Sequence, residues 1–208
     1  MDVFDAIRGR RSHRAFKRDR VEFEKIDQIL DAAQWAPSPA NNQPWEFIVV
    51  SGSDARMRLI ELSEQARKEG FVELHGFSFV RPVPYGADES PKSDLPPSDY
   101  SLSFLKNVPV MIAVVGNPEP TVRPSQVERV HDGYKYACSA AIQNMLLAAE
   151  ALGLGSLWFT LFDRDLLNRF LGIDPKKHLI AIVCIGYPVA APPSPGRYPL
   201  TTKVRRIE

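Results

Sequence analysis

Residues 36–45 read Ala36-Pro37-Ser38-Pro39-Ala40-Asn41-Asn42-Gln43-Pro44-Trp45. We call this stretch the amide loop. Its three prolines restrict the backbone, and its hydroxyl and amide side chains can donate and accept hydrogen bonds. An ordinary connection between a helix and a strand needs only a turn residue or two, so this composition is typical of a rigid polar wall beside a ligand. An ordinary surface loop explains the same residues equally well.

Apolar periodicity predicts regular elements on both sides of the amide loop. Residues at helical spacing predict a helix over about 22–35, and residues 47–50 predict a buried strand. Ser53 is the candidate N-cap of a helix that runs towards Gly70. Farther along, the same reasoning predicts strands at 108–116, 155–160 and 179–186, and helices at 2–8, 134–152 and 163–172.

Two kinds of residue within these elements carry local expectations. Asp163 is predicted to cap the N-terminus of the helix at 163–172, and Gly172 is predicted to end it. Gly153 is predicted to end the helix at 134–152. In the long helix Gln143 and Asn144 are polar exceptions, which we expect to satisfy neighbouring backbone groups.

Length and composition limit the class of protein. A chain of 208 residues with 44% hydrophobic residues can bury one sizeable core, so we expect a single domain over 1–208. A net charge of +1 gives no overall case for nucleic acid or an anionic membrane, which leaves a small molecule as the expected ligand. No stretch resembles a signal peptide or a membrane span, so we expect a soluble cytoplasmic protein. Cys138 and Cys184 are expected to be reduced packing residues.

The densest positive charge lies at Arg10-Arg11-Ser12-His13-Arg14, which we call the arginine loop. Guanidinium groups beside a serine hydroxyl can hold a phosphomonoester through bidentate hydrogen bonds. On charge alone, however, a solvated basic face is the favoured explanation, because runs of charge are usually solvated.

Residues 71–106 form a proline-rich segment without periodicity, which we interpret as an irregular insertion. Its aromatic residues suit a lid over a flat substrate. Two other interpretations, a dimer clasp and a mobile surface loop, are together as well supported as the lid. A second irregular stretch, about 188–208, forms an extended tail.

The sequence lacks the common motifs of protein-based catalysis. Gly153-Leu154-Gly155 follows a helix and precedes a strand, the reverse of a dinucleotide fingerprint, and no phosphate loop is present. The four histidines lack metal-site spacing, so no metal is expected. No nucleophile motif is visible either. Binding groups without a reactive side chain indicate that a cofactor supplies the chemistry.

Taken together, these motifs resemble the nitroreductase family of flavoenzymes. The resemblance rests on the arginine loop, the amide loop and three later segments, in the same order along nearly the whole chain: Gly153-Leu154-Gly155-Ser156-Leu157-Trp158, Gly186-Tyr187-Pro188 and Arg197. It implies an α+β fold with a mainly antiparallel central sheet wrapped by helices. It also implies a domain-entwined homodimer with FMN at the subunit interface.

The resemblance also implies roles for particular residues. Arg10, Arg11, Ser12 and Arg14 would hold the FMN phosphate and ribityl chain, and Arg197 would close on the phosphate from the tail. Ser38, Pro39, Asn41 and Gln43 match the loop that lines the flavin from the partner subunit. Trp158, Phe159 and Thr160 match the segment along the flavin ring. Several family members carry an acidic residue and a glycine where Thr160 and Leu161 stand, so we expect hydrogen bonding to the flavin to differ here.

The implied activity is a ping-pong transfer, from NAD(P)H to FMN and then to an electron-poor acceptor such as a nitroaromatic compound or a quinone. A dehalogenase or ring reductase of the same family, or a non-catalytic flavin sensor or carrier, are the alternatives. The insertion matches no family segment and belongs to the region that usually shapes the substrate pocket. The physiological acceptor and the choice between NADH and NADPH are therefore open.

Overall fold

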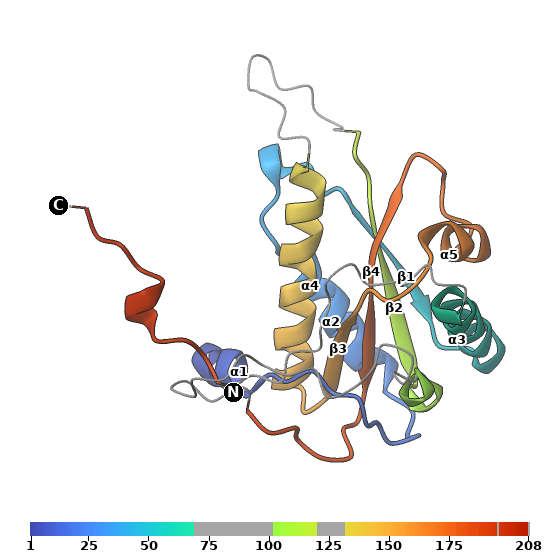
Figure 1. The fold of residues 1–208 in the computed structure, drawn as a ribbon, viewed down its shortest axis with the longest axis horizontal. Helices are drawn as coiled ribbons and strands as arrows, with labels where there is room; N and C mark the ends of the chain where they lie inside the picture. Colours follow the sequence, from blue (N-terminus) through green and yellow to red (C-terminus); the bar gives the residue numbers. More distant parts are fainter. Residues whose placement is uncertain (69–101, 120–131, 195, 208) are drawn as a thin grey trace.

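The computed structural model describes residues 1–68, 102–119, 132–194 and 196–207, and its centre is a four-stranded sheet (Figure 1). The strands are β1 (Trp45–Val50), β2 (Val110–Gly116), β3 (Gly155–Phe159) and β4 (His178–Gly186). They lie in the order β1-β2-β4-β3, and all neighbouring strands are antiparallel. The predicted antiparallel sheet is therefore confirmed.

The central strand β2 shows why the sheet needs helices on both faces. Every residue of β2 is buried. Because successive side chains of a strand point to opposite faces, Met111, Ala113 and Val115 join one core cluster and Val110, Ile112 and Val114 join the other. A continuous apolar run is the pattern expected for a strand covered on both sides.

One face of the sheet is covered by α2 (Phe23–Gln34) and α4 (Gly133–Ala151), and α1 (Val3–Gly9) also packs on α4. The predicted helix over 134–152 is thus confirmed as a central element of the core. Asn144 donates from Nδ2 to the carbonyl of Ala32 in α2, at 3.0 Å. The polar exception in α4 therefore satisfies a backbone group of the neighbouring helix.

The other face is covered by α3 (Ser53–Lys68) and α5 (Arg164–Leu171), together with the short helix η3 (Ser103–Asn107). Asp163 caps α5 as predicted, because its Oδ1 accepts from the amide of Leu166 at 2.9 Å. Gly172 ends the same helix with φ +66°, a conformation that favours glycine. Ser53 differs slightly from the prediction: it is the first residue of α3, and its hydroxyl donates to Asp54.

Both cysteines pack inside the protein, as expected from the sequence. Cys138 lies in α4 and Cys184 in β4, and each is fully buried and free of disulfide bonds. Burial raises the pKa of each thiol to about 12. Neither group is therefore a thiolate at neutral pH.

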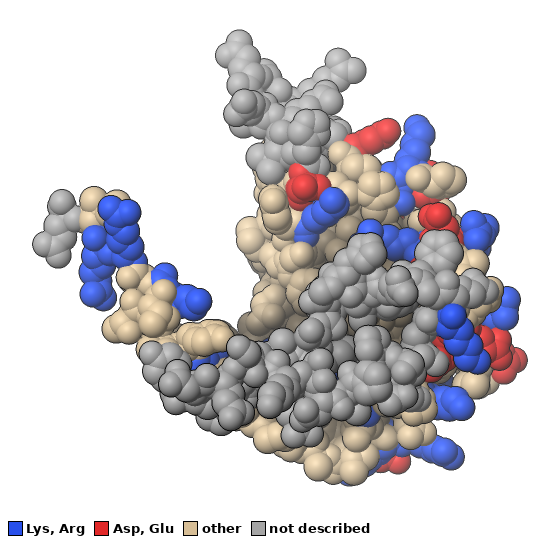
Figure 2. All heavy atoms as spheres, in the orientation of Figure 1, with Lys and Arg blue, Asp and Glu red and all other residues tan. Residues whose placement is uncertain are grey.

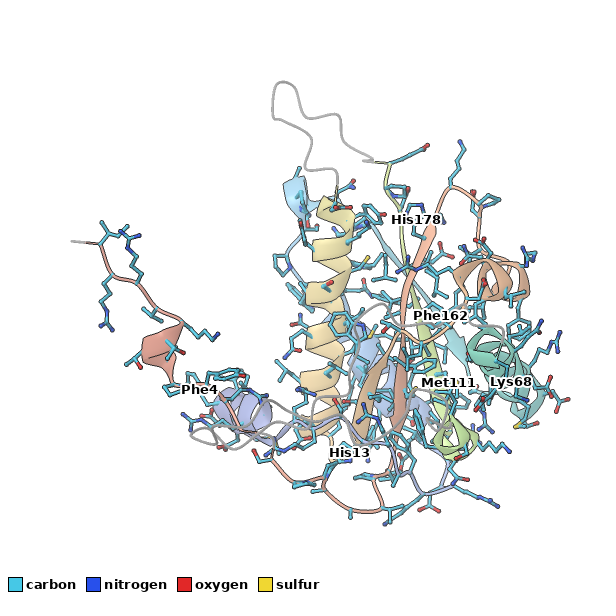
Figure 3. All side chains as sticks on the ribbon, in the orientation of Figure 1. Phe4, His13, Lys68, Met111, Phe162 and His178 are labelled. Carbon is cyan, nitrogen blue, oxygen red and sulfur yellow. The ribbon has the colours of Figure 1, made fainter. Side chains whose placement is uncertain are left out.

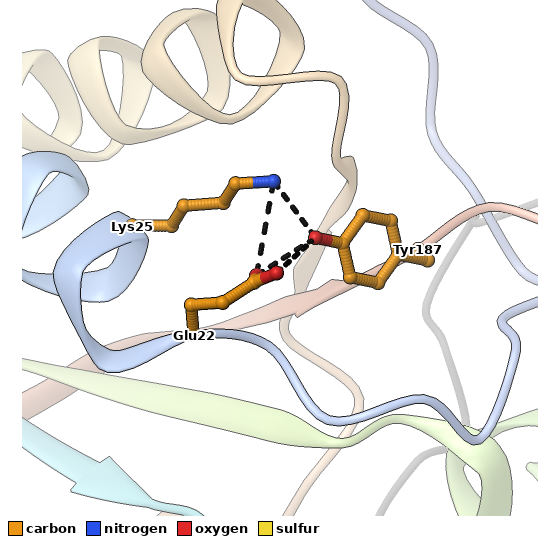
Figure 4. Close-up of polar contacts among 3 residues, drawn as sticks. All are labelled: Glu22, Lys25 and Tyr187. Atoms are coloured by element: carbon orange, nitrogen blue, oxygen red, sulfur yellow. Dashed lines mark hydrogen bonds and ion pairs between the residues drawn. The ribbon is translucent and has the colours of Figure 1, made fainter.

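The segment after β4 is tied to α2 by a small polar cluster (Figure 4). Tyr187 donates from its hydroxyl to the carboxylate of Glu22, at 2.7 and 2.9 Å, and Lys25 donates to the same hydroxyl at 2.7 Å. The Lys25 ammonium also lies 4.9 Å from the centre of the Tyr187 ring. These contacts hold the chain just where it leaves the sheet.

We expect Tyr187→Phe to lower the melting temperature by at most about 4 °C at pH 7, because the cluster is partly exposed. The Tyr187 hydrogen bond is the main cause of a lowered pKa for Glu22, whose ordinary value is 4.5. A carboxyl group whose pKa is lowered by folding stabilises the folded protein at pH values above its ordinary pKa. This stabilisation is lost as the pH falls through the pKa of the group in the folded protein. Thermal melts of the wild type and of Tyr187→Phe should show that the difference between their melting temperatures becomes smaller from pH 7 to pH 3. A constant difference would contradict the assigned role of Glu22.

Beyond Tyr187 the chain runs back beside the N-terminal segment. Lys17 donates its amide to the carbonyl of Tyr187 at 2.8 Å, and Val189 donates to Ala15 at 3.1 Å. Residues 196–207, which we call the arm, then lead away from the rest of the molecule (Figure 1). Most of the irregular insertion predicted at 71–106 lies outside the described residues. In the described part of the chain, no helix combines the length and apolar character needed to cross a membrane.

Candidate cofactor site

The arginine loop is positioned by α1 and by the edge strand β3. Asp2 caps the start of α1 by accepting the amide of Phe4 at 2.6 Å, and the helix ends at Arg10. The chain then extends along β3, where Ser12 pairs with Ser156 in a parallel bridge. Side chains alternate along extended backbone, so Ser12 and Arg14 are exposed and His13 between them is buried.

The arginine loop lines a surface pocket of about 210 Å³. The residues lining it are Arg10, Arg11, Ser12, Arg14, Pro192 and Pro193. The structure thus brings together the four predicted phosphate ligands, and none of the six lining residues is acidic. Three guanidinium groups and a hydroxyl make a site rich in donors, which suits a phosphate group. The two prolines were not predicted as site residues, although the proline-rich tail was visible in the sequence.

Arg11 has a structural contact that the sequence did not indicate. Its Nη1 donates to the carbonyls of Arg8, Gly9 and Arg10, at 2.5, 2.9 and 3.0 Å. These carbonyls lie at the C-terminal end of α1, where the helix leaves acceptors without partners and carries a partial negative charge. Arg11 therefore stabilises the end of α1 as well as lining the pocket.

The segment predicted to follow the flavin ring continues the same edge strand. Trp158 is 37% exposed, and Thr160, just after β3, is also exposed. Phe159 is buried, and its ring packs on Phe162 with 5.9 Å between centroids, so only its backbone can face a ligand. From Ser156 to Thr160 a strand advances about 13 Å.

The amide loop has a strained and internally bonded backbone. Ala40, Asn41 and Gln43 have φ values of 51°, 54° and 44°, a region that residues other than glycine rarely adopt. Ser38 accepts the amide of Gln43 at its Oγ, at 3.0 Å, and Gln43 donates to Oδ1 of Asn41 at 3.2 Å. Strain of this kind is often found at ligand sites. Three of its polar side chains, Ser38, Asn41 and Gln43, therefore bond within the loop.

The predicted site residues do not all meet within one chain. The short helix η1 (Pro39–Asn41) of the amide loop lies beside the N-terminal end of α4 (Figure 1). The arginine loop lies at the other end, where a Cβ on Gly9 would come within 2.6 Å of Glu150. A helix of 19 residues is about 28 Å long. One flavin-sized ligand therefore cannot touch both loops of the same chain.

The arm also stands apart from the pocket. Arg197 is not among the pocket-lining residues, and its Nη1 donates to the carbonyl of Gly196. The arm carries several basic residues (Figure 2) and large exposed apolar side chains. The latter are Tyr198, Leu200, Val204 and Ile207.

Comparison with known proteins shows which family the chain belongs to. The model of the nitroreductase family matches residues 7–187. The chain belongs to this family. It is therefore an enzyme, an oxidoreductase of the nitroreductase type, and the resemblance predicted from its motifs is confirmed.

Similar proteins cover most of the nitroreductase-family chain. A protein of Methanothermobacter thermautotrophicus, named as an NADH dehydrogenase/NAD(P)H nitroreductase, is 32% identical over 92% of this chain and 80% of its own length. A nitroreductase-type structure from Desulfovibrio desulfuricans, in complex with FMN, is 28% identical, with a TM-score of 0.68 and coverage of 100% and 98%. Iodotyrosine deiodinase bound to FMN and 3-iodo-L-tyrosine shares the fold, with a TM-score of 0.77, 22% identity and coverage of 100% and 99%.

Proposed function

We propose that this protein is an FMN-dependent oxidoreductase that passes electrons from NAD(P)H to an electron-poor acceptor such as a nitroaromatic compound or a quinone. The observation that carries the proposal is the pocket formed by Arg10, Arg11, Ser12 and Arg14 beside β3. Its donors fit a phosphate monoester, and the edge strand β3 leads from Ser156, which pairs with Ser12, to Trp158 and Thr160. The FMN-bound relative from Desulfovibrio desulfuricans supports the same cofactor.

The placement of the two loops supports a homodimer with shared sites. Because the amide loop and the arginine loop of one chain lie at opposite ends of α4, a second copy is needed to bring Ser38, Pro39, Asn41 and Gln43 to a flavin held by the arginine loop. The arm, with Arg197 and its exposed apolar residues, would reach that second copy.

Each residue has a limited role in the proposed mechanism. Bound FMN would supply hydride transfer, which no side chain of the described site can perform. Arg10 and Arg14 bind the phosphate and favour negative charge in the site. The exposed Thr160 would offer its hydroxyl and amide as hydrogen-bonding groups for the flavin, and the exposed Trp158 ring would help to exclude water from it.

An absorption spectrum of the purified protein tests the proposal. We expect oxidised-flavin bands that bleach when NADH or NADPH is added without oxygen, and that return on addition of a nitroaromatic compound or a quinone. If the purified protein neither carries nor binds FMN, the assignment of FMN as its cofactor is wrong. Flavin that never bleaches would favour a sensor or carrier, and reoxidation by halogenated phenols alone would favour a dehalogenase.

A further inference from the structure

The last turn of α4 places a carboxylate beside the arginine loop. Glu150 is half-buried, and a Cβ on Gly9 would lie 2.6 Å from its Oε1, so the carboxylate lies against the backbone of Gly9 at the end of α1. Figure 3 shows His13 of the arginine loop near this end of α4, with His178 at the opposite end of β4. The carboxylate is therefore at the same end of the molecule as the proposed phosphate site.

Arg11 contacts the same glycine. Its Nη1 donates to the Gly9 carbonyl at 2.9 Å. Standard backbone dimensions then limit the distance between this nitrogen and the Glu150 Oε1 to at most about 10 Å. Among the residues that the structure describes, no ion pair joins Glu150 to an arginine or a lysine. The carboxylate thus acts on the guanidinium groups through its electric field, without an ion pair.

The charge of Glu150 is unfavourable within its own helix. The C-terminal end of a helix carries a partial negative charge, so a carboxylate in the last turn of α4 lowers the stability of that helix. The end of α1 beside it carries a partial charge of the same sign. The arginine loop supplies the opposite charge, because three of its guanidinium groups surround one pocket. The position of Glu150 is therefore explained by the arginine loop and not by its helix.

Both signs of charge act on the layer directly below the pocket. His13 is buried, and the residues on either side of it line the pocket. Burial is the main cause of the lowered pKa of His13. Glu150 acts against this shift, whereas Arg10 and Arg11 act with it. This pattern agrees with the geometry: the field of Glu150 extends into the arginine loop and opposes the arginines there.

We propose that Glu150 determines how strongly the cofactor site prefers FMN to riboflavin: its carboxylate lowers the positive potential of the phosphate pocket and weakens the binding of the FMN phosphate. This inference rests on the proposed FMN function. A phosphate monoester carries a charge of about −1.5 to −2 at pH 7. A fixed carboxylate behind the arginines repels that charge, and salt screens the repulsion. In consequence the flavin ring contributes a larger share of the affinity, and phosphate compounds without a flavin compete less well.

Titration of the apoprotein with FMN and with riboflavin tests this role. Riboflavin lacks the phosphate, so the ratio of its dissociation constant to that of FMN measures the phosphate pocket. Glu150→Gln removes the charge and keeps the shape of the side chain. We expect it to raise this ratio about three-fold at an ionic strength of about 10 mM, without changing the dissociation constant of riboflavin. At about 1 M the ratios of variant and wild type should agree, because the Debye length is then only about 3 Å.

Glu61→Gln is the matched control. It removes the same charge from α3, on the other face of the sheet, where Glu61 pairs with Arg58. Its ratio should equal that of the wild type. If Glu150→Gln does not fold, Glu150→Ala replaces it, because alanine also lacks the charge and is the best helix former.

Three results would overturn the role of Glu150 while leaving the FMN function intact. They are an unchanged ratio in Glu150→Gln, a rise of equal size in Glu61→Gln, and a rise that persists undiminished at high salt. A fall of the ratio in Glu150→Gln would also overturn it, because the carboxylate would then support the arginines and not oppose them. A wild-type apoprotein that does not bind FMN would overturn the proposed function as well.

Discussion

Replacing Arg14 with alanine is expected to raise the FMN dissociation constant about 10- to 100-fold, because a charge-assisted hydrogen bond is worth about 1.5–3 kcal/mol. Arg14 lines the pocket of the arginine loop and is exposed. The melting temperature of the apoprotein should therefore change little. Titration of apoprotein with FMN, followed by flavin fluorescence, measures the first quantity, and a thermal melt measures the second.

Two further variants separate phosphate binding from other effects. Arg11→Ala should weaken FMN binding and also destabilise the apoprotein, because the Arg11 guanidinium holds the carbonyls at the end of α1. Arg20→Ala removes a charge of the same sign outside the pocket, where Arg20 lies 4.4 Å above the Phe23 ring. It should not change FMN affinity. If Arg14→Ala and Arg20→Ala behave alike, the pocket is not the phosphate site.

Replacing Gly186 with alanine is expected to destabilise the protein by about 3 kcal/mol, which corresponds to a fall in melting temperature of about 6–12 °C. An added Cβ would lie 2.6 Å from Cδ and 2.9 Å from Cγ of Pro109, and 3.0 Å from Cδ1 of Phe16. The Pro109 ring is bonded to its own backbone at both ends and cannot swing away. Relief of the clash would therefore require β4 to shift relative to the start of β2.

Gly52→Ala is the control for this change. An added Cβ at Gly52 meets nothing within 4 Å. The free energy of unfolding should therefore change by less than about 1 kcal/mol, and the melting temperature should stay close to that of the wild type. Thermal or urea unfolding of both variants makes the comparison. Equal stability of the two variants would show that the packing between Gly186 and Pro109 is looser than the structure indicates.

Most helices and strands could be predicted from the sequence because their causes are local. The spacing of apolar residues located α2, α4 and β4 to within a residue or two, and Asp163 and Gly172 marked the ends of α5. Side-chain periodicity and capping depend on neighbours within one turn, so they are visible in the sequence alone.

The candidate site could be predicted only in part. Runs of arginine and of amide side chains were evident, and their combination in order identified the family. The role of Arg11 at the end of α1, the buried ring of Phe159 and the contribution of Pro192 and Pro193 were not evident. Each of these depends on which distant segment lies beside the residue.

The sequence by itself thus determined the positions of most helices and strands and the hydrogen-bond donors available for a phosphate. Through the family resemblance it also indicated the antiparallel fold. Tertiary structure alone decided the strand order β1-β2-β4-β3, the pairing of Ser12 with Ser156, and the placement of the arginine and amide loops at opposite ends of α4. The physical reason is that periodicity specifies which face of an element is buried but not what covers it. The partner of each face is chosen by packing between segments far apart in the chain.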